Sequence, residues 1–191
     1  MRKGKIIIIS GPSGSGKTTL HKRLLLSRLL KGKLVKSISA TTRPRRPGER
    51  NGRDYLFISK KLFCRKKETG YFLEWQKVFN NYYGTPKDAV LKLLQSGKNV
   101  LLCIDVKGTR LIRQQYPEAR TVFIKAPSWA VLRNRLKIRK SETERNLKMR
   151  LAIARREMRE AKRYDHVVVN DHLTTALKKL ESIVSQELKK G

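Results

Sequence analysis

The chain has 191 residues, of which 39% are hydrophobic, enough for one compact domain and too many for a disordered chain. Its 46 Lys and Arg against 15 Asp and Glu give a formal net charge of +31, which attracts polyanions such as nucleotides or nucleic acid. Cys64 and Cys103 are the only cysteines and lie outside any CxxC or Cys/His pattern, which argues against a disulfide scaffold or a zinc site.

The first predicted element is a strand over Ile6–Ile9, a short β-branched run between Gly4 and Gly11 that is typical of a strand buried on both faces. The run is too short for a secretory signal, and no other stretch approaches the length of a membrane span. We therefore expect a cytoplasmic protein without a membrane partner. Apolar residues at helical spacing predict a helix after the next loop: Leu20, Leu24, Leu25 and Leu29.

Further short β-rich runs alternate with helical stretches along the rest of the chain. These runs are Val100–Ile104, Thr121–Ile124 and Val167–Val169. Alternation of this kind predicts an α/β fold with a parallel sheet flanked by helices.

Two segments interrupt the alternation. Residues 35–90 are rich in turn signals with strand-like pieces such as Tyr55–Ile58, and they predict a small β-containing insertion. Residues 129–163 are almost wholly polar and basic at helical spacing, as in a helical lid. The predicted division is a single domain whose core comprises about 1–34, 91–128 and 164–191.

The segment from Gly11 to Thr18 fits the phosphate-loop pattern G-x-x-x-x-G-K-[ST] at every fixed position, between a predicted strand and a predicted helix. The glycines let successive N–H groups face inward, and the helix N-terminus adds its dipole. Lys17 can reach the β- and γ-phosphates, and the Thr18 hydroxyl can ligate Mg²⁺. The predicted ATP-binding residues of the loop are Gly11, Pro12, Ser13, Gly14, Ser15, Gly16, Lys17, Thr18 and Thr19.

A series of motifs beyond the phosphate loop closely resembles guanylate kinase, a P-loop kinase of nucleoside monophosphates. The motifs follow in order along nearly the whole chain: Ser39–Glu49, Asn51–Tyr55, Phe72–Trp75, Tyr82–Thr85, Ile104–Val106, Arg135-Leu136 with Arg139 and Arg150, Tyr164-Asp165 and Val169–Asp171. The resemblance implies a core, an acceptor-binding insertion and a lid. It also implies transfer of the terminal phosphoryl group of ATP to GMP, giving ADP and GDP, with Mg²⁺ and with dGMP as a further acceptor.

The resemblance also assigns the acceptor site. Guanidinium forks hold phosphate oxygens bidentately and phenol hydroxyls complete the shell, which suits a clamp on the acceptor phosphate. A carboxylate suits guanine, whose Watson–Crick edge presents the N1 and N2 protons. The implied clamp is Arg43, Arg46, Tyr55 and Tyr83, and the implied guanine readers are Glu74 with Ser39 and Thr85.

In the lid, the matching positions are those of arginines that contact the phosphates during transfer. Phosphoryl transfer depends on alignment and on neutralising charge, so no dedicated general base is expected. The implied catalytic residues are Lys17, Arg46, Arg135, Arg139 and Arg150, Asp105 is implied near the acceptor and the metal, and Asn170 is implied at ATP.

Cys103 departs from the family pattern, because it stands where an acidic residue usually contributes to binding on the guanine side. A thiol is a weak partner, and losing one charge-assisted hydrogen bond costs about 1.5–3 kcal/mol. We expect weaker GMP binding or looser base choice, which Cys103→Glu should reverse. Ala40, Lys107 and Lys140 also differ from the usual residues.

Three alternatives stay open from the sequence. A non-catalytic guanylate-kinase-like module would bind phosphorylated peptides, but such modules usually lose the residues that are present here. A related kinase would phosphorylate a different acceptor. The net charge permits nucleic-acid binding, although no aromatic residues are interleaved with the basic ones. A monomer and a homodimer both fit the sequence.

Overall fold

A computed structural model describes residues 3–137 and 144–190. Its central sheet runs in the order β2-β7-β1-β8-β9, and each neighbouring pair is parallel. The predicted parallel α/β architecture is therefore confirmed. The strands of this sheet are β1 (Ile6–Ser10), β2 (Leu34–Lys36), β7 (Asn99–Cys103), β8 (Arg120–Lys125) and β9 (His166–Val169).

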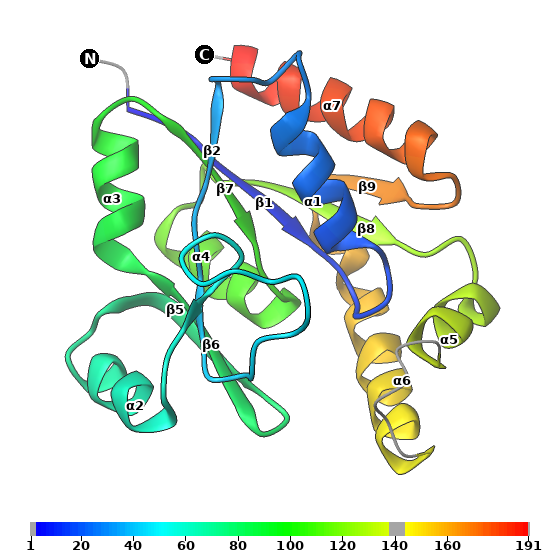
Figure 1. Cartoon of the computed structure of the whole chain (residues 1–191). Helices are drawn as coiled ribbons and strands as arrows, with labels where there is room; N and C mark the ends of the chain where they lie inside the picture. The colour runs from blue at the N-terminus through cyan, green and yellow to red at the C-terminus, as the bar shows by residue number, and fades with distance from the viewer. Residues whose placement is uncertain (1–2, 138–143, 191) are drawn as a thin grey trace.

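Successive isoleucines of β1 pack into hydrophobic cores on opposite faces of the sheet, as the two-residue period of a strand requires. Ile7 and Ile9 pack against α1 (Lys17–Leu26) and α7 (Leu173–Lys189). Ile6 and Ile8 pack against α3 (Lys87–Gln95) and α4 (Val106–Gln115). Figure 1 shows the resulting three layers, with helices on both sides of the sheet.

Helix α1 ends earlier than its leucine spacing predicts. Leu20 and Leu24 are buried on α1, but Leu29 lies beyond the helix and is 50% exposed. The chain leaves the helix at Ser27, whose backbone is extended with ψ 129°. Leu29 therefore has the sequence spacing of a helical residue but is not part of the helix.

The segment predicted as an insertion carries a second, smaller sheet in the order β4-β3-β6-β5. The stacked rings of Phe63 and Phe72, with centroids 4.4 Å apart, form its small core together with Ala40. Phe79 forms the tip of the β5–β6 hairpin with a left-handed φ of 54°. The elements are β3 (Ala40–Thr41), β4 (Leu56–Phe57), α2 (Lys60–Glu68), β5 (Phe72–Val78) and β6 (Asn81–Pro86).

The segment predicted as a lid forms α5 (Trp129–Lys137), α6 (Glu144–Arg159) and the 3₁₀ turn η1 (Glu160–Arg163). Leu132 and Leu136 of α5 pack against Ala154 of α6 in a separate cluster. The guanidinium of Arg155 lies 5.3 Å from the centre of the Trp129 ring. In the insertion, the Lys67 ammonium lies 5.0 Å from the centre of the Trp75 ring.

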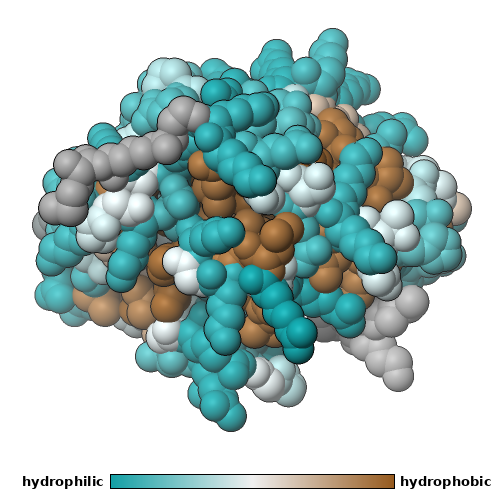
Figure 2. All heavy atoms as spheres, turned by 90° about the horizontal axis from the view of Figure 1, so that it is seen from above, coloured by the Kyte–Doolittle hydropathy of each residue, from teal (hydrophilic) through white to brown (hydrophobic). Residues whose placement is uncertain are grey.

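Hydrophilic residues cover much of the surface seen from above in Figure 2 and surround an apolar area near its middle. The exposed Leu26 and Leu29 lie at and just beyond the end of α1. Within residues 3–137 and 144–190, no helix combines the length and apolar character needed to cross a membrane.

Candidate active site

The phosphate loop connects the end of β1 to the start of α1, and neighbouring backbone restricts its shape. A side chain at Gly11 would place its Cβ 2.3 Å from the carbonyl oxygen of Ile124. At Gly16, where φ is 90°, the Cβ would lie 2.1 Å from Nδ2 of Asn170. Both positions therefore require glycine, for close approach and because φ is positive at each, 139° at Gly11 and 90° at Gly16.

Lys17 opens α1, and its ammonium donates to the carbonyl of Pro12 at 3.0 Å, so its side chain folds back over the loop. Thr18 lies in the first turn of α1 and lines a small cavity of about 40 Å³ beside the loop. Ser15 Oγ is buried without a hydrogen-bond partner among the described residues.

Asn170 joins three segments at the loop. Its side chain donates to the carbonyl of Ser15 at 2.8 Å, and its backbone N–H donates to the carbonyl of Lys125 at 2.7 Å. Its own carbonyl accepts a hydrogen bond from Nη2 of Arg135 at 3.2 Å. Asn170, predicted at ATP, and Arg135, predicted at the phosphates, therefore meet beside the phosphate loop.

Arg135 also has a guanidinium nitrogen that is available to a ligand. Its Nη1 is buried and has no hydrogen-bond partner within the part of the chain that the structure describes. A buried guanidinium nitrogen without a partner is costly, and a phosphate oxygen is the partner that a guanidinium fork fits best. Arg139, also predicted in the lid, lies outside the described residues.

Arg150 on α6 contacts the segment predicted as the acceptor-binding insertion. Its guanidinium lies 5.0 Å from the centre of the Phe79 ring at the tip of the β5–β6 hairpin. The segment predicted as a lid and the segment predicted as the acceptor-binding insertion therefore touch across the site.

The residues predicted to clamp the acceptor phosphate lie together in part. Arg43 donates from Nη2 to both carboxylate oxygens of Glu49, at 2.7 and 3.0 Å, and lies 5.6 Å from the centre of the Tyr55 ring. The rings of Tyr55 and Tyr83 are 6.1 Å apart. Arg46 is exposed, and its backbone N–H donates to Glu49 at 2.8 Å.

Glu74 and Thr85 face each other on the paired strands β5 and β6. The Thr85 hydroxyl donates to Oε1 of Glu74 at 2.6 Å, and both side chains are buried. Burial raises the pKa of Glu74 to about 7, the Thr85 hydrogen bond opposes the rise and Asp105 adds to it. A buried carboxyl group whose pKa lies near 7 is unusual and marks a functional-site candidate.

Asp105 is the N-cap of α4, since its Oδ1 accepts a hydrogen bond from the N–H of Gly108 at 2.7 Å. A Cβ at Gly108 would lie 2.6 Å from Oε2 of Glu74, so the N-terminus of α4 closely adjoins the residue predicted to read guanine. Burial raises the pKa of Asp105 despite that hydrogen bond. The predicted acceptor residues Glu74 and Asp105 thus lie on neighbouring elements.

Cys103 ends β7 and lines the same small cavity as Thr18, Ser39 and Tyr55. Burial raises the pKa of its thiol, although Lys17 and Lys36 act in the opposite direction. The thiol is therefore neutral at pH 7, although the charges of two lysines lower its pKa.

Glu157 is one of the residues near this site to which the sequence assigned no role. It lies on α6, two turns beyond Arg150. Burial raises its pKa to about 7, Lys17 and Lys107 oppose the rise, and Asp105 adds to it. An isolated acid within a strongly basic helix was the only available signal.

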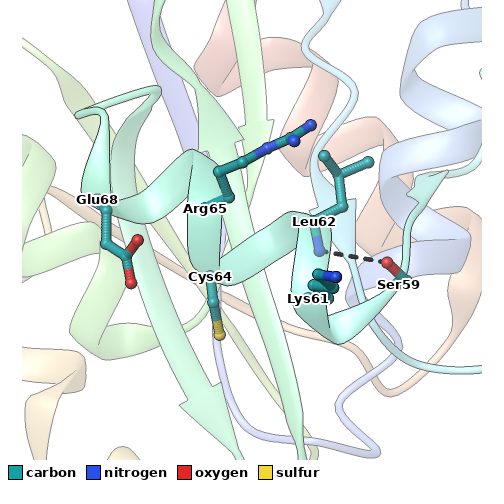
Figure 3. A pocket seen from close by; sticks show the side chains of 6 residues that line it. All are labelled: Ser59, Lys61, Leu62, Cys64, Arg65 and Glu68. Carbon is teal, nitrogen blue, oxygen red and sulfur yellow. Dashed lines mark hydrogen bonds between the residues drawn. The ribbon is translucent and has the colours of Figure 1, made fainter.

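A larger hollow of about 480 Å³ lies elsewhere, along α2 and its N-cap Ser59. Figure 3 shows the side chains that line it, all from one helix and the residue before it. Ser59 Oγ accepts a hydrogen bond from Leu62 N–H at 3.2 Å, which is an ordinary helix cap. Its lining includes none of the predicted site residues.

Comparison with known proteins agrees with this arrangement. The family model described as guanylate kinase matches residues 3–187. The guanylate kinase of Symbiobacterium thermophilum is 43% identical over 185 residues, covering 97% of this chain and 86% of that protein. The guanylate kinase of Coxiella burnetii is 44% identical, covering 98% and 89%. The crystal structure of guanylate kinase from Anaplasma phagocytophilum superposes with a TM-score of 0.81 at 30% identity, covering 100% of this chain and 89% of that one.

Proposed function

The chain belongs to the guanylate kinase family, and from this premise we propose how its residues transfer the terminal phosphoryl group of ATP to GMP, giving ADP and GDP. The observation that carries the assignment of the acceptor is the buried pair of Glu74 and Thr85. This pair lies next to Asp105, whose charge raises the pKa of Glu74. The charge of Asp105 also raises the pKa of Glu157, and the phosphate-loop Lys17 lowers it.

ATP binds with its phosphates in the phosphate loop. Backbone N–H groups of the loop donate to phosphate oxygens, and Lys17 leaves the Pro12 carbonyl for the β- and γ-phosphates. The Asn170 side chain binds the loop at the carbonyl of Ser15, and the Asn170 carbonyl binds Arg135 and orients it toward the phosphates.

The donor set suits a magnesium ion that arrives with ATP. Mg²⁺ keeps several waters and takes substrate phosphates with one or two protein oxygens, and the Thr18 hydroxyl is such an oxygen. When bound, the ion neutralises charge on the transferring group. Asp105 is a further oxygen donor close to Lys17.

GMP binds with its base at Glu74 and its phosphate at Arg43, Tyr55 and Tyr83. The ionised carboxylate accepts from N1 and N2 of guanine, with Ser39 and Thr85 supplying hydroxyls. Adenine presents no such pair of donors, so Glu74 selects guanine. The phosphate competes with Glu49 for Arg43, which makes clamp formation depend on the acceptor.

Transfer requires the two phosphates to be held in line while their charge is neutralised. We assign this task to Lys17 and Arg135, which contact the phosphate loop and Asn170, and to Arg150, which contacts Phe79. Arg46 and Arg139 are assigned to the same task by their motif positions. The contact of Arg150 with Phe79 supports a closed state in which the lid covers both substrates. No side chain is assigned as a general base.

The test is ADP formation by the purified protein with MgATP and, in turn, GMP, dGMP, AMP, CMP and UMP. Turnover confined to GMP and dGMP is expected. ATP binding with turnover of none of the five acceptors would contradict the proposal and favour a different acceptor or a binding module. A reaction on free nucleotides also fits the cytoplasmic location expected from the sequence.

A further inference from the structure

One face of α1 serves both the phosphate loop and the acceptor insertion. Thr18, His21 and Lys22 are spaced i, i+3 and i+4 and therefore share a face of the helix. All three line the small cavity beside the loop, opposite Glu49 and Tyr55 of the insertion. The helix that begins with the nucleotide-binding Lys17 thus lies directly against the acceptor-phosphate clamp.

The contact across this face centres on Asp54, a buried carboxylate. Its Oδ1 accepts a hydrogen bond from the Lys22 ammonium at 2.6 Å. Its Oδ2 accepts from the backbone N–H of Arg50 at 2.9 Å and from Nε and Nη2 of Arg53 at 3.0 and 2.9 Å. Hydrogen bonding from Lys22 is the main cause that holds the pKa of Asp54 well below its usual range.

The backbone next to Asp54 is held as well. The Lys36 ammonium on β2 donates to the carbonyls of Arg53 and Asp54, at 2.6 and 3.0 Å. Tyr55 follows at once, with its ring against Tyr83 and under the guanidinium of Arg43. The position of the phosphate clamp therefore depends on contacts that originate in the core.

We propose that Asp54 is a positioning residue whose ion pair with Lys22 couples binding at the phosphate loop to binding of the acceptor phosphate at Tyr55. The inference rests on the proposed function, since it assumes that GMP occupies the acceptor site. Arg50 and Arg53 belong to the same turn as Asp54, and Lys36 holds only backbone carbonyls. The pair with Lys22 is thus a direct side-chain link between the turn and α1.

Coupling of this kind is reciprocal. If ATP on the loop fixes α1 and thereby Tyr55, it raises GMP affinity, and GMP raises ATP affinity by the same factor. We expect a factor of about ten, within the range usual for coupled sites.

The experiment measures the dissociation constant of GMP by isothermal titration calorimetry, with and without a non-hydrolysable ATP analogue and Mg²⁺. The wild-type ratio of the two constants is expected near tenfold, and Lys22→Met is expected to bring it to about one. Lys22 is half exposed, so this variant should fold. Asp54→Asn should give the same ratio, and the double variant should be no worse than either single one.

Two controls separate positioning from stability. Lys22→Arg keeps the charge and should restore the coupling, whereas Arg23→Met removes an exposed cation of the same helix and should leave the wild-type ratio unchanged. A wild-type ratio of one, or an unchanged ratio in folded Lys22→Met, would overturn the inference while the proposed function stands. Absence of GMP binding to the wild-type protein would instead contradict the proposed function and the inference together.

Discussion

The phosphate loop and the acceptor insertion position their functional groups by different means. In the loop, close backbone approach sets the geometry: a Cβ at Gly11 or Gly16 would collide with the carbonyl of Ile124 or the amide of Asn170. In the insertion, paired polar side chains set it, as in Arg43 with Glu49 and Glu74 with Thr85. The geometry set by close packing does not depend on pH, whereas the geometry set by these pairs does, because they contain carboxyl groups that titrate.

The difference suits the two substrates. A triphosphate offers many equivalent oxygens, and a rigid ring of N–H donors binds them without regard to the base. An acceptor must be identified by its base, which requires side chains of specific charge at specific places. We therefore expect substitutions in the loop to act through its shape and substitutions in the insertion to act through charge.

Gly16→Ala should cause the largest loss. The new Cβ would displace Asn170 and occupy a backbone with φ 90°, so several loop N–H groups would leave their positions. Losing two charge-assisted hydrogen bonds weakens ATP binding by about a hundredfold or more. Calorimetric titration with MgATP measures this. Gly32→Ala is the matched control, because its φ is 76° with no atom within 4 Å, and it should cost only stability. Equal ATP affinity in both variants would contradict the steric argument.

Glu74→Gln should lower kcat/KM for GMP by roughly tenfold to a hundredfold, because the amide replaces one acceptor oxygen with a donor. The ratio of GMP to AMP turnover should fall with it. Glu68→Gln, an exposed substitution on α2, should change neither. Loss of GMP turnover with an unchanged preference over AMP would show that Glu74 does not read the base.

The same residue gives the insertion a pH dependence. Since the pKa of substrate-free Glu74 is raised from 4.5 to about 7, its ionised form is disfavoured in the folded protein. Its contribution to the free energy of unfolding is present below pH 4.5 and is lost as the pH rises through about 7. GMP needs the ionised form, so its affinity should rise over the same range, while ATP affinity measured alongside should not follow it. In Glu74→Gln only the dependence caused by the GMP phosphate, whose second pKa is about 6, should remain.

Cys103→Glu should have a moderate effect of opposite sign. The added carboxylate would lie where Lys17 and Lys36 exert their charge and would restore an acceptor on the guanine side. We expect the KM for GMP to fall about tenfold. Cys103→Ser, similar in size and uncharged, should stay within about twofold of the wild type. An unchanged KM in Cys103→Glu would mean that the thiol position does not limit acceptor binding.

Glu187→Gln should leave both substrates' affinities unchanged and lower only stability. Glu187 lies at the other end of the sheet, buried on α7, with Lys190 at 2.6 Å, His166 at 3.0 Å and Arg120 at 3.1 Å. Burial alone would raise its pKa, but Lys190 and His166 lower it, so the added stability is present above pH 4.5 and fades as the pH falls.

The expected loss in Glu187→Gln at pH 7 is about 1–3 kcal/mol, or roughly 2–12 °C in Tm. Glu160→Gln, which breaks the exposed pair with Arg163, should lose less than about 1 kcal/mol. A changed KM in Glu187→Gln would show that the two substrate regions are not locally determined.

The sequence predicts best what depends on local pattern. The isoleucine run, the phosphate-loop motif and the alternation of strands and helices each lie within a few residues, and they indicate the fold and the ATP side. The end of α1 was misjudged because Leu29 keeps the spacing after Ser27 has left the helix. Tertiary packing between distant segments brings Lys22 to Asp54 and Glu157 near Lys17. No local sequence pattern predicts these contacts.

The two tryptophans of the chain are divided between the two accessory segments, Trp75 in β5 and Trp129 at the start of α5. Each is partly exposed, at 38% and 37%, and each ring lies beside a cation of its own segment, Lys67 or Arg155. Trp75→Phe and Trp129→Phe would each leave a single fluorophore. Stopped-flow traces of these two variants would then time the response of the lid and of the insertion separately, in the unlabelled protein.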